Sequence, residues 1–324
     1  MVTYVIRRLL YSIPVLIAAS FLIFTFVSVS SDPTGFLRMV PGADLATIER
    51  IEERKHLNDP VPVRYLHWVE EALTDQFGTT IIGDRPIWPD LRRVMGNTAQ
   101  LLIAAVLLQI VLGVAIGVYS AVRQYSPFDY AATTFSFLGL ATPNFWLALM
   151  LQVLVVNILL KYDVRLFYVS GLSSVDPGEG IHFWLDRLQH LALPIFVIAI
   201  AGIASYSRYM RASMLEVVNS DYVRTARAKG LPERTVVMRH AFRNALIPLV
   251  TLIALDFGAL FGGAVITETI FSLDGMGFYF VNALNEGDPY PIMAWLMVTA
   301  TLIIVFNLIA DVVYGYLDPR VRYD

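Results

Sequence analysis

The stretch DYVRTARAKGLPERTVVMRHAFRNALIPLV, residues 221–250, holds six Lys and Arg side chains and one central Gly-Leu-Pro between two apolar segments. The whole chain is 56% hydrophobic and only 16% charged, so a basic segment of this kind stands out. That composition is too apolar for an ordinary soluble domain, and several apolar runs approach the roughly 20 residues that span a bilayer. The sequence therefore predicts an all-α polytopic membrane protein that carries one basic, helix-forming segment between its spans.

Apolar segments long enough to cross a bilayer occur six times. They lie at residues 9–29, 98–120, 131–160, 190–210, 245–266 and 292–313. The first is longer than the apolar region of a signal peptide, so we expect an uncleaved anchor. The third contains Thr142-Pro143-Asn144, which predicts a kinked or broken helix.

Lys and Arg residues are unevenly distributed over the loops. With the N-terminus inside, the cytoplasmic segments hold 13 of them: two at 7–8, one at 123, eight from 208 to 243 and two at 320–322. The short outer loops hold only three. The positive-inside rule therefore predicts that both termini are cytoplasmic and that segment 30–97 lies outside.

These spans divide the chain into four parts. We expect an N-terminal end with the first span at 1–29, an extracytoplasmic insertion at 30–97, a core of five spans at 98–313 that includes the basic loop 211–244, and a tail at 314–324. The insertion shows helical spacing at 45–55 and 63–74 with a proline-rich break between them. A cap is favoured over a spacer loop, because four apolar side chains need burial: Leu66, Trp68, Val69 and Phe77.

Several kinds of active site are missing from the sequence. It has no Gly-Lys-Ser/Thr phosphate loop, no His-Glu-x-x-His zinc helix, no Gly-x-Ser-x-Gly nucleophile turn and no Cys. Its five histidines show no ligand spacing: His56, His67, His182, His190 and His240. We therefore expect no catalytic residue and no metal or cofactor bound by this chain.

Only two acidic residues, Asp256 and Asp311, fall within the apolar spans. An ionised side chain at bilayer depth costs at least about 3 kcal/mol, so each should face a cavity or a partner. We expect Asp256 to face a translocation cavity, with pairing to a companion subunit as the alternative. A secondary transporter that works alone would show inverted repeats and more intramembrane polar groups, and a purely structural subunit that anchors other proteins is the other alternative.

The basic stretch itself has the pattern of two short helices, about 221–229 and 232–244, joined at Gly230. A basic segment can simply lie on lipid headgroups. The Gly-Leu-Pro turn argues against this, because a helix lying on lipid gains from continuity. A short bounded helix that protrudes from the membrane suits a groove on another protein.

At these residues the chain resembles the dipeptide and oligopeptide permease family of binding-protein-dependent ABC importers, in its B-type subunit. The similar motifs are IRRLL at 6–10, YVRTARAKG at 222–230, HAFRNALIP at 240–248, ETIF at 268–271, GMG at 275–277 and DPR at 318–320. Arg224 and Thr225 stand where the general Glu-Ala-Ala-x-x-x-Gly motif of ABC importers has Glu and Ala. Leu273-Asp274 and the loose DQFG at 75–78 also depart from the family pattern.

The resemblance implies the type I ABC importer permease fold in the inner membrane. It implies a heterodimer with a homologous second permease, two partner ATPases that hold ATP and Mg, an extracytoplasmic substrate-binding protein, and no nucleic acid. Segment 221–245 would dock in an ATPase as the coupling element. The implied solutes are peptides, with nickel chelates or glutathione as alternatives carried by similar subunits.

The expected site residues form three groups. The ATPase-coupling residues are Tyr222, Arg224, Ala226, Lys229, Gly230, Leu231, His240 and Asn244. Pro143, Asn144 and Asp256 are expected along the translocation pathway. Glu268 is expected either to meet the binding protein or to serve as a local cap.

Overall fold

The computed structural model describes residues 2–30, 32–35, 38, 44–81 and 83–317. Within these ranges the regular structure is helical, and the only β-type pairing is an isolated bridge between Thr79 and Pro86. The chain forms two compact units, residues 1–98 with 274–305 and residues 99–273 with 306–324. Two long helices, α5 (Ile87–Val122) and α14 (Pro289–Leu317), contribute to both units.

Six helices in the described ranges are long and apolar enough to cross a membrane. Their candidate spans are Ile6–Ser30 in α1 (Val2–Ser30), Ile87–Val122 in α5, Asn144–Tyr162 in α7, Ile181–Val218 in α8, Glu233–Ile253, and Pro289–Val312 in α14. The predicted six-span α-helical protein is thereby confirmed. The DPR motif and the two arginines at 320–322 lie outside the described residues.

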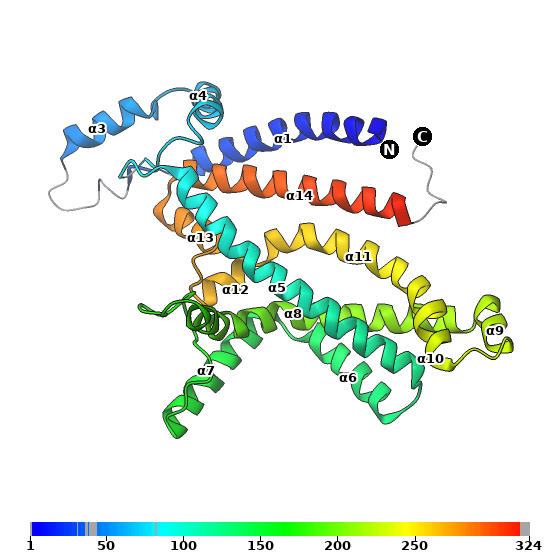
Figure 1. Cartoon of the computed structure of the whole chain (residues 1–324). Coiled ribbons are helices and arrows are strands. Elements are labelled where there is room, and N and C mark those ends of the chain that lie inside the picture. Colours follow the sequence, from blue (N-terminus) through cyan, green and yellow to red (C-terminus); the bar gives the residue numbers. More distant parts are fainter. Residues whose placement is uncertain (1, 31, 36–37, 39–43, 82, 318–324) are drawn as a thin grey trace. The chain divides into compact units, whose positions relative to one another are not determined.

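The third predicted span is not one helix. The chain forms α6 (Pro127–Ala141) and α7 (Asn144–Tyr162), which change direction at the break between them (Figure 1). Ser126 caps α6 by accepting a hydrogen bond from the Asp129 N–H, and Pro143 occupies the N-cap position of α7. The predicted break is confirmed, and the candidate membrane span is Asn144–Tyr162 in α7, which is shorter than the segment predicted at 131–160.

In the second unit the helices pack around α8 (Ile181–Val218), which extends beyond both ends of the span predicted at 190–210. A Cβ at Gly113 of α5 would lie 2.7 Å from the Cβ of Tyr206, and one at Gly117 would lie 2.6 Å from the carbonyl oxygen of Ser207. Two glycines four residues apart therefore let α5 approach α8 more closely than any side chain would allow.

In the first unit, α3 (Leu45–Arg54) and α4 (Val61–Thr74) form where the sequence predicts helices. Tyr65 and Trp68 of α4 are buried, and the Tyr65 hydroxyl lies 2.8 Å from the Ser20 Oγ of α1, in hydrogen-bond contact. Leu66 points away and is 66% exposed, contrary to the predicted burial. The face of α4 that packs on α1 is thus aromatic, and Trp68 is buried as predicted.

Candidate functional site

The basic segment begins with α9 (Asp221–Ala228), which follows the end of α8 after a short turn (Figure 1). Val223 and Ala226, three positions apart, share one face of α9 and are buried. They belong to one hydrophobic cluster with Met214 of α8 and with Val236. The other six side chains of α9 are exposed. One apolar face therefore holds this helix in place, and its polar face is free for contacts outside the chain.

The turn after α9 depends on the backbone of Gly230. Its φ of +73° lies in the left-handed region, as predicted for the helix end, and its N–H donates to the carbonyl oxygen of Arg227 at 2.9 Å. No heavy atom beyond its chain neighbours would lie within 4 Å of a Cβ at this position. The position therefore favours glycine for its backbone conformation and not for lack of space.

An ion pair closes the same turn. The guanidinium of Arg227 donates to the carboxylate of Glu233 through Nη2 at 2.8 Å and through Nε at 3.2 Å. This two-bond contact joins the residues on either side of Gly-Leu-Pro. The pair was not predicted, although opposite charges flanking a predicted tight turn were a usable signal.

The second half of the segment differs from the prediction of a short bounded helix at 232–244. A short α10 (Glu233–Thr235) passes into a π-helical stretch, η1 (Val236–Ala241), which continues directly into α11 (Phe242–Gly263). Val236, Val237 and Ala241 are buried in the same hydrophobic cluster as α9. The π stretch is thus the start of a spanning helix, so a movement of α9 and its turn would reach the membrane part without a flexible loop.

The predicted coupling residues fall into two sets. Tyr222 and Leu231 are 45% and 38% exposed, and Arg224, Lys229, Gly230 and Asn244 are exposed as well. Ala226 is buried, so its contribution is to let α9 pack closely and not to contact a partner. His240 is half-buried, and its carbonyl oxygen accepts a hydrogen bond from Asn244 Nδ2 at 3.1 Å.

A buried carboxylate lies at the start of α6, where this helix meets α8. Asp129 accepts hydrogen bonds from Arg211 Nε at 2.6 Å and Nη2 at 2.8 Å, from the Ser120 hydroxyl, and from the Tyr125 N–H at 2.9 Å. The Arg211 guanidinium, through these hydrogen bonds, holds the pKa of Asp129 well below its usual range, although burial acts in the opposite sense. This Asp129 cluster, formed by the four residues named, joins α5, α6 and α8 and was not predicted.

The expected pathway residues lie at the break between α6 and α7 and on α11. Pro143 and Asn144 are exposed at the break between α6 and α7. Asp256 of α11 is partly exposed and lies near the buried hydroxyl of Tyr206 on α8. Asp256 thus faces α8 on one side and is accessible on the other, which is compatible both with a cavity and with a companion subunit.

Glu268 lies in α12 (Val265–Ile270) and is fully buried. Its backbone carbonyl accepts a hydrogen bond from the Leu273 N–H at 2.9 Å, which closes the turn after the helix. A fully buried side chain offers no surface to another protein. Of the two roles expected for Glu268, this position therefore favours the local cap over contact with the binding protein.

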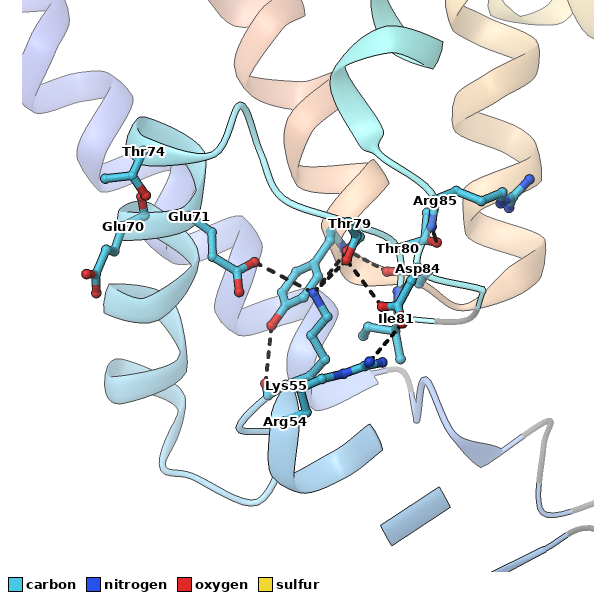
Figure 2. A network of polar contacts seen from close by, with 12 residues as sticks. Arg54, Lys55, Glu70, Glu71, Thr74, Thr79, Thr80, Ile81, Asp84 and Arg85 are labelled. Carbon is cyan, nitrogen blue, oxygen red and sulfur yellow. Dashed lines mark hydrogen bonds and ion pairs between the residues drawn. The ribbon is translucent and has the colours of Figure 1, made fainter. Parts of the chain in front are cut away.

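In the first unit, a lysine is buried where segment 44–81 meets the start of α14 (Figure 2). Lys55 Nζ donates to Thr79 Oγ1 at 3.1 Å and to the Thr79 carbonyl oxygen at 3.3 Å, and it lies 3.9 Å from Glu71 Oε2. It also lies 5.2 Å from the ring centroid of Tyr290. Neutral oxygens, a carboxylate and an aromatic face together replace the water that this cation loses.

A buried acid completes this arrangement. Asp288 accepts hydrogen bonds from the Ile81 N–H at 2.7 Å and the Tyr290 N–H at 3.0 Å. Burial raises the pKa of Asp288 to about 6, although the two N–H donors partly oppose the shift. We call Lys55, Glu71, Thr79, Asp288 and Tyr290 the Lys55 network. It attaches the segment between the first two spans to the last span.

Six apolar helices in the described ranges, with a basic segment folded between two of them, define a multi-pass membrane protein. A solved structure described as "Crystal structure of an amino acid ABC transporter with histidines" has the same fold, with a TM-score of 0.52 and 14% identity over 70% of this chain and 94% of that chain. The family described as "Binding-protein-dependent transport system inner membrane component" matches residues 113–323.

Full-length relatives agree with the family match. The chain is 39% identical to the oligopeptide transport system permease protein AppB of Bacillus subtilis, over 100% of both chains. It is 36% identical to the dipeptide transport system permease protein DppB of Alkalihalophilus pseudofirmus, again over 100% of both. The chain therefore belongs to the family of binding-protein-dependent transport inner-membrane components. It is a permease subunit of an ABC importer, a system that contains further subunits.

Proposed function

We propose that this permease imports peptides and that segment 221–245 couples import to partner ATPases. The proposal for peptides is supported by the names of the full-length relatives, which are oligopeptide and dipeptide permeases. These names favour peptides over nickel chelates and glutathione. The single observation that carries the coupling role is the structure of α9 and its turn. The helix is short, it is buried on one face and exposed on the other, and the left-handed Gly230 turn follows it.

The geometry supports a direct mechanical connection. ATP binding would close the ATPase pair and displace α9, whose buried face packs against the end of α8 and against η1. Since η1 continues into α11, the displacement reaches two candidate membrane helices without an intervening flexible loop. For the pathway to open alternately to the two sides of the membrane, the ATPases must contact the exposed residues of α9 differently in the two conformations of the permease. A partner that made equal contacts in both conformations would not shift the equilibrium between them.

The remaining assignments follow from this proposal. Tyr222, Arg224, Lys229 and Leu231 form the contact surface for an ATPase, and Ala226 and Gly230 set the position and angle of α9. The chain itself is non-catalytic, and ATP and Mg are held by the partner ATPases. A second, homologous permease would complete the pathway, and an extracytoplasmic binding protein would deliver the peptide.

Orientation and pathway are part of the same proposal. The excess of basic residues in segment 208–243 supports a cytoplasmic position for α9 and for both termini, with segment 30–97 outside. Pro143 and Asn144 would expose backbone groups at the break between α6 and α7. Asp256 would favour the cationic amino terminus of a peptide.

Replacing Gly230 by Val tests the coupling role. A β-branched residue is strongly disfavoured at φ +73°, at a cost of about 1 to 3 kcal/mol. If that cost appears at the interface, ATPase association falls roughly 5- to 150-fold. The purified complex should then lose its ATPases, or hydrolyse ATP without a response to the loaded binding protein.

Gly171→Val is the matched control, because Gly171 has a φ of +76° and a Cβ placed there would likewise meet no atom within 4 Å. It carries similar backbone strain at a position outside the basic segment. We expect it to keep its ATPases and their stimulation. Equal loss in both variants, or normal coupling in Gly230→Val, would contradict the proposal.

A further inference from the structure

Three side chains that could bind a metal ion meet at the turn between α3 and α4. His56 and Asp59 lie in the turn and His67 lies in α4, and the potential ligand atoms of the three lie within 4.8 Å of one another. The spacing of histidines along the sequence indicates no ligand set, because His56 and His67 are separated by a proline-rich break. Only the reversal of the chain at that break brings the two imidazoles together.

The distance between His56 and Asp59 matches the separation of two ligands in a metal site. His56 Nδ1 lies 3.3 Å from Asp59 Oδ2. Two ligands at about 2.1 Å from a tetrahedral zinc ion are separated by about 3.4 Å. The His56 and His67 rings stack, with centroids 4.3 Å apart and planes inclined by 10°. To bind one ion, the stacked rings would rotate so that a nitrogen of each points to a common position beside the carboxylate.

The backbone holds the turn in an unusual conformation. His56 has a φ of 53°, in the left-handed region that few residues other than glycine occupy. Conformations of this kind tend to occur at functional sites. The Asp59 N–H donates to the His56 carbonyl oxygen at 3.1 Å, so the two residues from the turn are held close to each other.

Each part of the group is attached to a membrane helix. The carbonyl oxygen of Lys55, the residue before His56, accepts a hydrogen bond from the Tyr290 hydroxyl of α14 at 3.3 Å. On α4, Tyr65 and Trp68 flank His67 and pack against α1. The side chain of Lys55 is itself held by its hydrogen bond to Thr79 (Figure 2). The backbone segments that carry the ligands are therefore both held in place.

We propose that His56, Asp59 and His67 bind a divalent transition-metal ion of the zinc class, with a fourth position open to water. Two imidazoles and one carboxylate suit Zn²⁺ and not Mg²⁺ or Ca²⁺, which prefer oxygen ligands alone. All three side chains are at least partly accessible, so an ion can enter from solvent. The bound ion would join the turn to α4 and stiffen the segment between the first two spans. The proposal does not depend on the solute or on the coupling role of α9.

The test uses the assembled importer, purified without a histidine tag. Titration calorimetry with Zn²⁺ and the visible absorption of Co²⁺ would be compared between the unmodified complex, His67→Ala and Asp59→Asn. Loss of one ligand should lower the affinity for Zn²⁺ by at least about tenfold. Removal of a residue that only hydrogen-bonds a metal ligand already lowers metal affinity by about 10- to 100-fold. Co²⁺ should show the intense absorption of a four-coordinate site only in the unmodified complex.

His182→Ala is the matched control, because His182 is exposed and lies outside this group. It should leave both signals unchanged. Asp59→Asn keeps the size of a partly exposed side chain, so it reports on metal binding even if His67→Ala fails to assemble. Zn²⁺ affinity that is unchanged in Asp59→Asn, or lost equally in His182→Ala, would overturn the proposal.

Discussion

Two buried carboxylates, Asp129 in the second unit and Asp288 in the first, are satisfied in opposite ways. Asp129, in the second unit, has Arg211 as a bidentate partner. Asp288, in the first unit, accepts hydrogen bonds from two backbone N–H groups, and Lys55 acts on it only as a nearby charge. The same chemical group therefore has a lowered pKa in one place and a raised pKa in the other.

The difference predicts how each region responds to pH. A carboxyl whose folded pKa is lowered stabilises the fold above its unfolded value and loses that contribution only in strong acid. A carboxyl whose folded pKa is raised binds a proton more tightly when folded, so its region loses stability as the pH rises through the folded pKa. Near neutral pH, the Asp129 cluster should be constant, whereas the Lys55 network should strengthen on mild acidification.

The largest effect is expected from Asp129→Ala. Removal of one member of a buried ion pair costs about 3 to 5 kcal/mol, because the remaining charge loses its partner. The thermal stability of the purified complex and the protease resistance of the α5–α6 connection should both fall. Replacing both residues, as in Asp129→Ala with Arg211→Met, should recover much of the loss. If the double variant is no more stable than Asp129→Ala, the loss of stability comes from the packing of the two side chains and not from the unpaired charge of Arg211.

A somewhat smaller effect, visible as pH dependence, is expected from Asp288. Its pKa rises from 3.8 to about 6 in the folded chain, so ionisation costs the fold roughly 3 kcal/mol between pH 4 and pH 7. Hydrogen exchange, corrected for intrinsic rates, should show the Ile81 amide better protected at pH 4.5 than at pH 7. In Asp288→Asn this pH dependence should vanish. Persistence of the same dependence in the variant would assign it to another group.

The smallest effect is expected at the ion pair that closes the Gly230 turn. Arg227 and Glu233 are 39% and 60% exposed, so water screens them and their coupling energy should be about 0.2 to 1 kcal/mol. A double-mutant cycle of Arg227→Ala and Glu233→Ala on ATPase association measures it. High salt should reduce the value further. A coupling energy above about 2 kcal/mol would mean that an ATPase buries the pair on docking.

Several features were predictable from the sequence because they depend on local chemistry. Six apolar segments of bilayer length can only be satisfied as helices, and Pro143 at the start of α7 marks the helix break that its missing N–H predicts. Gly230 between two helix-forming stretches predicts a left-handed turn, and its φ of +73° agrees. The motifs of segment 222–248 were also enough to identify the family, which the full-length relatives confirm.

What only the tertiary structure decided depends on residues far apart in the chain. Arg211 is 82 positions from Asp129, and Asp288 is 207 positions from Ile81, so no sequence window contains either contact. The burial of Glu268 and the exposure of Leu66 likewise depend on which helix covers each face, which a local apolar pattern does not specify. The grouping of His56 with His67 arises from a chain reversal. The sequence determined the spans and the turn because hydrophobicity and backbone freedom act locally, whereas the polar partners were decided by packing, since a buried charge must be satisfied by whatever group the fold brings to it.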